Sequence, residues 1–142
     1  MKPPRKRPEL MEIGDEVYAL LRMAEQDWEI FLVLKDAPKV ELAGVCFHAQ
    51  QCIEKTLKAV LVAHGLIFER THNLVALSER LIGHGVSLPV DIDELAKLNP
   101  CAVIFRYDDR EIEMIGRDET LHIVERIRVW ATALIPIPAS EQ

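Results

Sequence analysis

The sequence lacks the features that mark several large classes of protein. No run of about 18 apolar residues is present, so no segment is long enough to cross a bilayer as a helix. The basic N-terminus is not followed by the apolar stretch of a secretory signal peptide, so we expect a cytoplasmic protein. Only 6 glycines and 8 prolines occur in 142 residues, and their clustering disfavours an all-β chain with frequent turns.

Cysteine is scarce, and the common catalytic and phosphate-binding motifs are missing. Cys46, Cys52 and Cys101 form no C-x-x-C pair, the spacing on which cysteine zinc sites depend. We expect all three to be buried thiols in a reducing compartment. The sequence has no glycine-rich phosphate loop, no nucleophile elbow and no H-E-x-x-H motif. It therefore predicts neither a bound metal nor a cofactor.

Charge is distributed unevenly along the chain. The net charge is −6, although the first eight residues are basic and contain no acidic residue. An acidic body does not attract phosphate backbones through its overall field, so nucleic acid could bind only at a local basic pocket. We predict a basic disordered leader over residues 1–12, which is either simply solvated or a weak arm for nucleic acid or a membrane surface. A single helical domain is expected over residues 13–136, with a short tail over 137–142.

Apolar residues recur at helical spacing along most of the chain, and no segment has the pattern of a strand. Thr71 and Asp118 are the expected N-caps of the third and the last helix. The expected helices span about 15–37, 40–64, 72–82, 91–97 or 91–105, and 119–134. The region between Asn99 and Gly116 is expected to hold a broken helix and then a loop. The predicted fold class is all-α, a four- to five-helix up-and-down bundle.

The second expected helix carries a polar ridge beside its broad apolar face. His48, Gln51, Lys55 and Lys58 follow one another at spacings of three and four residues, so they line one side of the helix. Donors of this kind suit a phosphate or the edge of an RNA base. The alternative is a solvated helix face with a Glu54–Lys58 pair at i, i+4. Both interpretations stay open at this point.

The amino-acid sequence of this helix resembles the signature of a known protein family. Residues 47–59, F-H-A-Q-Q-C-I-E-K-T-L-K-A, resemble the F-H-A-Q-Q-x-x-E-K-x-L-K-A signature of HEPN-domain proteins. R-T-H-N-L at 70–74 and R-Y at 106–107 resemble two further motifs of that family at fitting distances. The resemblance covers about residues 15–135. It implies a HEPN-like helical bundle, a homodimer, and association with nucleotides or RNA, in a toxin–antitoxin-like pair with a minimal nucleotidyltransferase.

The resemblance also suggests site residues. Phe47 lies among the polar residues on one side of the second expected helix. A large aromatic side chain there is expected to pack against a second surface, from the bundle or from another copy of the chain, so we assign it to the dimer interface. Arg70 and His72 join the expected ligand-binding set. Arg106 and Tyr107 either lock the following loop or present a guanidinium and a ring to a base.

Two further histidines, His64 and His84, stand beside glycines at expected helix ends. At such a position an imidazolium complements the helix dipole. This explanation requires no ligand.

Many HEPN proteins are metal-independent ribonucleases with an R-x4-6-H motif. One literal match occurs here, with Arg117 and His122 as the candidate catalytic pair. The histidine would transfer protons and the arginine would stabilise charge on the phosphate. Two acidic residues between them, and Val124 where the toxin motif has tyrosine, depart from the pattern. The remaining hypotheses are a nucleotide- or RNA-binding module and a purely structural dimeric adaptor.

Overall fold

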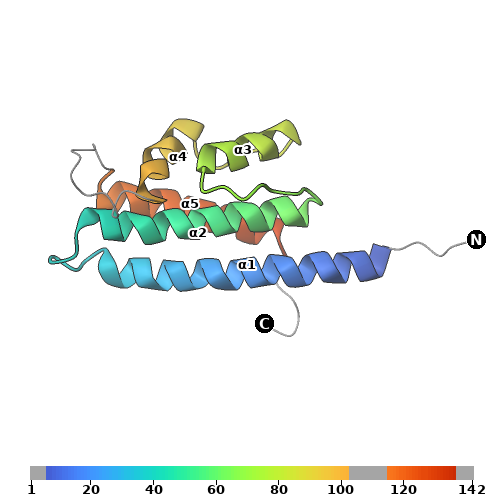
Figure 1. Cartoon of the computed structure of the whole chain (residues 1–142), viewed down its shortest axis with the longest axis horizontal. Helices are drawn as coiled ribbons and strands as arrows, with labels where there is room; N and C mark the ends of the chain where they lie inside the picture. Colours follow the sequence, from blue (N-terminus) through green and yellow to red (C-terminus); the bar gives the residue numbers. More distant parts are fainter. Residues whose placement is uncertain (1–5, 103–114, 137–142) are drawn as a thin grey trace, which may run out of the picture.

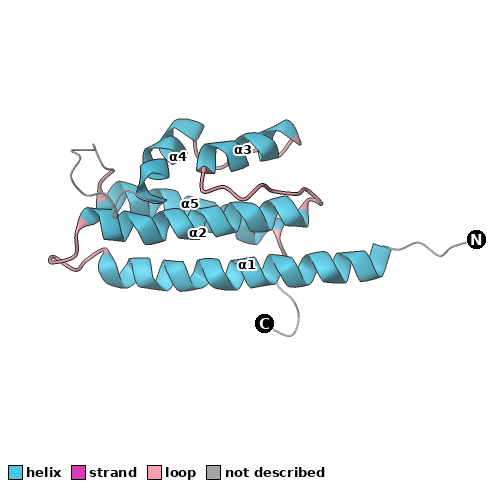
Figure 2. Cartoon of the chain, viewed as in Figure 1, coloured by secondary structure: helices cyan, strands magenta, loops and turns pink. Residues whose placement is uncertain are grey.

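The structure is a computed structural model that describes residues 6–102 and 115–136, with backbone only for 6–13 (Figure 1). Every regular element in these residues is helical (Figure 2). The elements are α1 (Lys6–Leu34), α2 (Leu42–Ala63), α3 (Leu74–Gly83), α4 (Ile92–Leu98), the 3-10 helix η1 (Asn99–Ala102) and α5 (Arg117–Leu134). The predicted all-α bundle is confirmed, and none of the helices in the described residues is long and apolar enough to cross a membrane.

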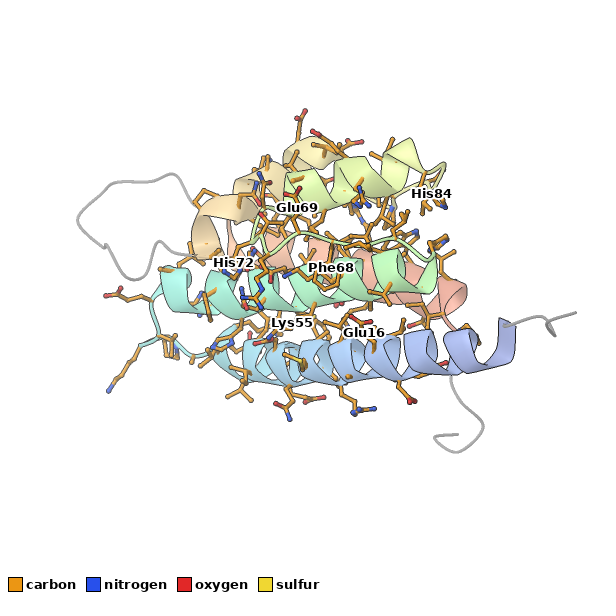
Figure 3. All side chains as sticks on the ribbon, turned by 45° about the vertical axis from the view of Figure 1, so that its right-hand side comes forward. Glu16, Lys55, Phe68, Glu69, His72 and His84 are labelled. Atoms are coloured by element: carbon orange, nitrogen blue, oxygen red, sulfur yellow. The ribbon has the colours of Figure 1, made fainter. Side chains whose placement is uncertain are left out.

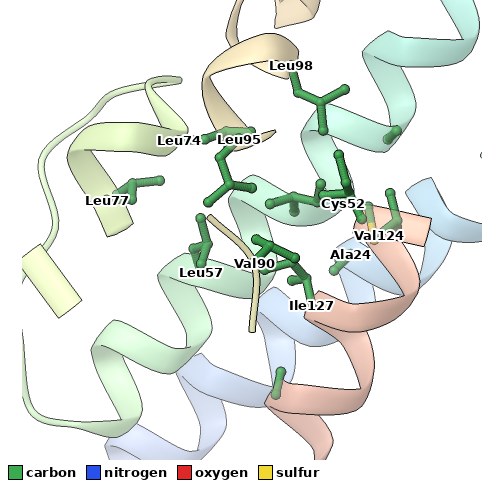
Figure 4. Packing of buried hydrophobic residues seen from close by; sticks show 14 of the residues in the cluster. Ala24, Cys52, Leu57, Leu74, Leu77, Val90, Leu95, Leu98, Val124 and Ile127 are labelled. Carbon is green, nitrogen blue, oxygen red and sulfur yellow. The ribbon is translucent and has the colours of Figure 1, made fainter. Parts of the chain in front are cut away.

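The long helix α2 lies at the centre of the bundle. It packs along α1 on one side, against α5 on a second, and against α3 and η1 on a third (Figure 1). Its apolar residues therefore reach well beyond one stripe, and many are fully buried, among them Val45, Ala49, Ile53, Leu57 and Leu61. Figure 4 shows side chains of α1, α3, α4 and α5 meeting α2. Each large buried side chain contributes about 1.5–3 kcal/mol to folding.

Four helix starts differ from the sequence prediction, and α2 begins at Leu42, two residues after the expected position. α1 begins at Lys6, so residues 6–12 of the predicted leader are helical. The N-cap of α3 is Asn73 instead of Thr71, because the Asn73 side chain accepts hydrogen bonds from the backbone N–H groups of Val75 and Ala76 at 3.0 and 3.2 Å. α5 begins one residue before Asp118 and is capped by Gly116.

The short helix α4 ends close to the shorter of the two predicted positions, Lys97. The backbone N–H of Asp91 donates to Glu94 Oε1 at 3.3 Å, as in the capping box of a helix N-terminus. The α-helix ends at Leu98 and the chain continues as the 3-10 helix η1, which contains Pro100. Proline cannot donate the hydrogen bond that a longer α-helix needs. The predicted broken helix and loop otherwise fall on residues 103–114, outside the described residues.

The three cysteines are buried and free, as predicted. Burial raises the pKa of the Cys52 thiol to about 12. A hydrogen bond from Cys101 lowers the pKa of Cys46, and the same contact, with burial, raises the pKa of Cys101. Cys46 is also within 3.8 Å of the carbonyl oxygen of Ile115, so this pair packs α2 and η1 against the start of α5.

We predict that none of these thiols reacts in the native protein. Iodoacetamide at mildly alkaline pH should add no carbamidomethyl group before unfolding. Burial keeps the reagent away from all three thiols, and the raised pKa of Cys52 and of Cys101 leaves little reactive thiolate there. Intact mass after denaturation in urea should show three adducts. Rapid labelling of native protein would mean that the core opens here on the time scale of the reaction.

Candidate functional site

The polar ridge of α2, defined as His48, Gln51, Lys55 and Lys58, is half-buried and not simply solvated. α1 covers one side of it, and the segment that leads into α3 covers the other. Figure 3 shows Lys55 on α2 and His72 on that segment. Each cation of the ridge is held by one of two buried carboxylates, Asp27 and Glu54, which we call the two carboxylate centres.

The first centre is the Asp27 carboxylate on α1. The residue is buried, with only 7% of its surface exposed. His48 Nδ1 lies 3.0 Å from Asp27 Oδ1, and the Lys55 ammonium donates to Oδ2. Both carboxylate oxygens are therefore satisfied from α2. Because Asp27 is on α1, this centre also joins the two longest helices of the bundle.

The second centre is the Glu54 carboxylate on α2 itself. It is 3% exposed and receives three contacts. Lys58 donates to Oε2 at 3.0 Å, while Oε1 lies 2.8 Å from His72 Nδ1 and 3.3 Å from Gln50 Nε2. Lys58 also lies 5.1 Å from the centre of the Phe68 ring, a cation–π contact. The Glu54–Lys58 pair of the alternative interpretation thus exists, inside a larger network.

Two glutamines form part of this network. Gln51 donates to Gln50 Oε1 at 2.6 Å, and the fully buried Gln50 donates to the backbone carbonyl of His72 at 2.8 Å. The carbonyl of His72 and its imidazole are therefore both held, although its side chain is 66% exposed. Satisfied networks of this kind rigidify the groups they contain.

The arrangement can move protons and hold anions. When Nδ1 of each histidine donates to its carboxylate, Nε2 keeps its lone pair and accepts a proton from a substrate. Two lysines balance two carboxylates, so the network is close to neutral when the histidines are neutral. The exposed Arg70, two residues before His72, adds a positive charge beside it. No metal-binding cluster of three or more suitable side chains occurs in the part of the chain that the structure describes.

The structure brings together most of the predicted ligand-binding residues. They lie in two clusters on one side of α2: His48 and Lys55 contact Asp27, while Lys58, His72 and, through Gln50, Gln51 belong to the Glu54 centre. Arg106 and Tyr107 lie outside the described residues. Phe47 is half-buried, with its ring 5.1 Å from the His48 ring, and its place in a dimer interface stays a prediction.

Arg117 binds the connection between α1 and α2. Its Nη1 donates to the carbonyl oxygens of Leu34, Lys35 and Ala37 at 3.2, 2.9 and 3.1 Å, and its Nη2 donates to that of Val40 at 2.6 Å. This guanidinium clamp fixes the start of α5 to the end of the α1–α2 pair. Both terminal nitrogens of the guanidinium are therefore engaged by backbone carbonyl oxygens of this connection.

His122 does not converge with Arg117 within one chain. Both residues lie in α5, where positions five apart point about 140° apart. His122 is exposed, and within the described residues it makes no hydrogen bond or ion pair. The catalytic role of this pair stays a prediction, for which the geometry of a single chain offers no support.

Sequence reasoning missed Asp27 and Gln50. Asp27 lies between Ala24 and Phe31 in the apolar stripe of α1, at the three- and four-residue spacings that mark buried positions. A charged residue in such a stripe needs a buried partner, and this was the available signal. Gln50 carried no comparable signal.

A groove of about 540 Å³ opens between α1 and α5, apart from the ridge. It is lined by apolar residues such as Leu21 and Ile135 and by Arg128. Arg128 pairs with Glu25 at 2.6 Å and lies 4.3 Å from the centre of the Trp28 ring, so its charge is already engaged. None of the ridge residues lines this groove.

Comparison with known proteins gives a family and one relative. A family model described as HEPN domain matches residues 17–134. A protein of Methanocaldococcus jannaschii named "Putative toxin MJ1304" is 40% identical over 50 residues, which are 35% of this chain and 32% of that protein. The chain thus spans about a third of the length of this relative. No solved structure matches.

Proposed function

Because the chain belongs to the HEPN domain family, we propose that it is a nucleotide- or RNA-binding module of a toxin–antitoxin-like system, with the polar ridge as its binding surface. Its partner in this proposal is a minimal nucleotidyltransferase, and the module itself works as a homodimer in the cytoplasm. One segment of 50 residues is similar to a protein named as a putative toxin, and this similarity supports a role in a toxin–antitoxin-like system.

One observation carries this proposal: two lysines and two histidines are gathered on one side of the bundle by two buried carboxylates. Charge-assisted hydrogen bonds from such groups are the usual way in which proteins hold phosphate. The carboxylate centres keep the side chains of Lys55 and Lys58 half-buried and ordered before a ligand arrives. Ordering the groups beforehand reduces the entropy that binding would otherwise lose.

Removing both lysines is expected to weaken RNA binding. Lys55→Ala with Lys58→Ala should raise the Kd for a fluorescent single-stranded RNA by about tenfold or more, since two phosphate contacts are lost. The dependence of log Kd on log salt concentration should also become shallower, by about 1 for each lysine. Fluorescence anisotropy at several salt concentrations measures both quantities.

Lys39→Ala with Lys97→Ala is the matched control. Both of these lysines are exposed and neither belongs to the ridge. The variant loses two positive charges, as Lys55→Ala with Lys58→Ala does. Affinity should stay close to that of the original protein. Equal weakening in both double variants would assign RNA binding to overall charge and remove the ridge from the proposal.

The two alternatives predict different results from the same preparations. A metal-independent ribonuclease at Arg117 and His122 should cleave RNA in EDTA, and the folded His122→Ala variant should lose that cleavage. A structural adaptor should neither bind nor cleave RNA. Binding without cleavage is the outcome that the ridge proposal expects.

A further inference from the structure

Two histidines that take no part in the ridge meet at the ends of two helices. His64 is the C-cap of α2 and His84 is the C-cap of α3, and their ring centroids are 6.2 Å apart at an interplanar angle of 81°. Gly65 and Gly85 follow them with φ of 73° and 88°, a left-handed conformation that suits glycine. Both helix ends are therefore well defined, and they bring together residues that are 20 positions apart in the sequence.

The tautomer of His64 is set by its own helix. Its Nδ1 lies 2.9 Å from the carbonyl oxygen of Val60. A carbonyl oxygen can only accept, so Nδ1 of the neutral ring carries the proton and Nε2 carries the lone pair. A histidine whose second nitrogen donates to a carbonyl is in the form that binds a metal ion through the first.

The two rings are close enough to reach a shared metal ion once one of them turns. With metal–nitrogen bonds of about 2.0–2.1 Å, two imidazoles on one tetrahedral ion have their ring centroids about 5 Å apart. The observed separation of 6.2 Å is longer than this arrangement requires. His84 is exposed, so its side chain is free to rotate toward a shared ion.

The helix dipoles add to the attraction for a cation. The C-terminus of a helix carries about half a negative charge, and two such ends lie beside this pair. Arg80, the basic residue in the last turn of α3, is exposed, so water and salt screen its charge. The local field therefore favours a positive ion at the two rings.

We propose that His64 and His84 form a two-histidine site for a borderline divalent transition metal such as Zn²⁺ or Cu²⁺. Imidazole nitrogen selects these ions over Mg²⁺ and Ca²⁺, which prefer oxygen ligands. No cluster of three protein ligands occurs in the described residues, so water fills the remaining positions. The bound ion ties the end of α2 to the end of α3. Spacing along the sequence gave no hint of this site because its ligands come from two helices.

Calorimetric titration of the full chain with ZnCl₂ at pH 7.5 tests the proposal. The original protein should bind the ion, and His84→Ala should weaken binding by about tenfold or more because the second ligand of the chelate is lost. His122→Ala removes an exposed histidine elsewhere and should bind as the original protein does. MgCl₂ should give no binding heat. Equal affinity in His84→Ala, or no binding by the original protein, would overturn the site.

Thermal unfolding provides an independent readout. Excess ZnCl₂ should raise the Tm of the original protein and of His122→Ala, since an ion that binds only the folded state stabilises it. The Tm of His84→Ala should rise less, since weaker binding gives a smaller gain in stability at the same ZnCl₂ concentration. Cu²⁺ electron paramagnetic resonance should show nitrogen ligands in the original protein and lose one of them in His84→Ala. An unchanged nitrogen signal in that variant would place the ion elsewhere.

Discussion

Arg117→Ala is expected to destabilise the folded protein by about 2–4 kcal/mol, because charge-assisted hydrogen bonds to four backbone carbonyl oxygens are lost together. These carbonyls belong to the end of α1 and the connection to α2, and nothing else in the described residues replaces the guanidinium there. Urea denaturation followed by far-UV circular dichroism measures the change. Arg117→Lys should recover only part of it, since an ammonium group cannot reproduce the planar fork.

The matched control for this prediction is Arg126→Ala. Arg126 is an exposed residue of the same helix with one ion-pair contact, 3.6 Å from Glu94. Its loss should change stability by less than about 1 kcal/mol. If Arg117→Ala were as stable as the original protein, the clamp would contribute nothing, and a functional role for Arg117 would become the better explanation.

This expectation changes how variants of the R-x4-H pair are interpreted. Loss of a biological effect in Arg117→Ala is the normal result of a destabilised bundle and does not identify a catalytic residue. His122→Ala is the informative change, because His122 is exposed and makes no polar contact within the described residues.

Glu54→Ala is expected to cost about 3 kcal/mol of stability. The carboxylate is 3% exposed and contacts Lys58, His72 and Gln50. Its removal leaves the Lys58 ammonium without its carboxylate, and the buried Gln50 amide keeps only the His72 carbonyl as an acceptor. Glu54→Gln keeps the shape and one acceptor oxygen, and should lose less. Thermal or urea denaturation of the two variants separates the stability lost with the negative charge from the stability lost with the side-chain volume.

Glu119→Ala is the control for the Glu54 variants. Glu119 forms an exposed pair with Lys97 at 3.2 Å, and exposed pairs contribute about 0–1 kcal/mol. Equal losses for Glu54→Ala and Glu119→Ala would mean that the second carboxylate centre is no more than a surface pair. That result would also weaken the case for an ordered ridge.

The sequence predicted the helices and the ridge residues of the two carboxylate centres. The 3.6-residue period identified α2 and placed His48, Gln51, Lys55 and Lys58 on one side of it, since neighbours on one helix follow from spacing alone. Helix ends were less certain because two capping residues, Thr71 and Asn73, stand two positions apart and only geometry decides which side chain reaches the free N–H groups.

Contacts between distant segments were not predictable in this way. Asp27 meets Lys55 across the α1–α2 interface, and Arg117 meets the connection around Ala37 from the other end of the domain. Such pairs depend on how helices are packed, which no periodicity within one helix specifies. The partners of Arg117 are backbone carbonyl groups. Because every residue has one, the sequence does not indicate which of them accept a hydrogen bond.

The two carboxylate centres mean that the ridge carries its own counterions. A phosphate that approaches Lys55 or Lys58 finds each ammonium facing a carboxylate of the same chain, so binding is an exchange of partners and not the filling of a vacant site. A single phosphate gains little from one such exchange. A polyanion that engages both lysines and the exposed Arg70 gains from several contacts after the first has been made. Under the proposed function, we therefore expect the ridge to discriminate by the length of the anion and to favour a chain of phosphates over an isolated one.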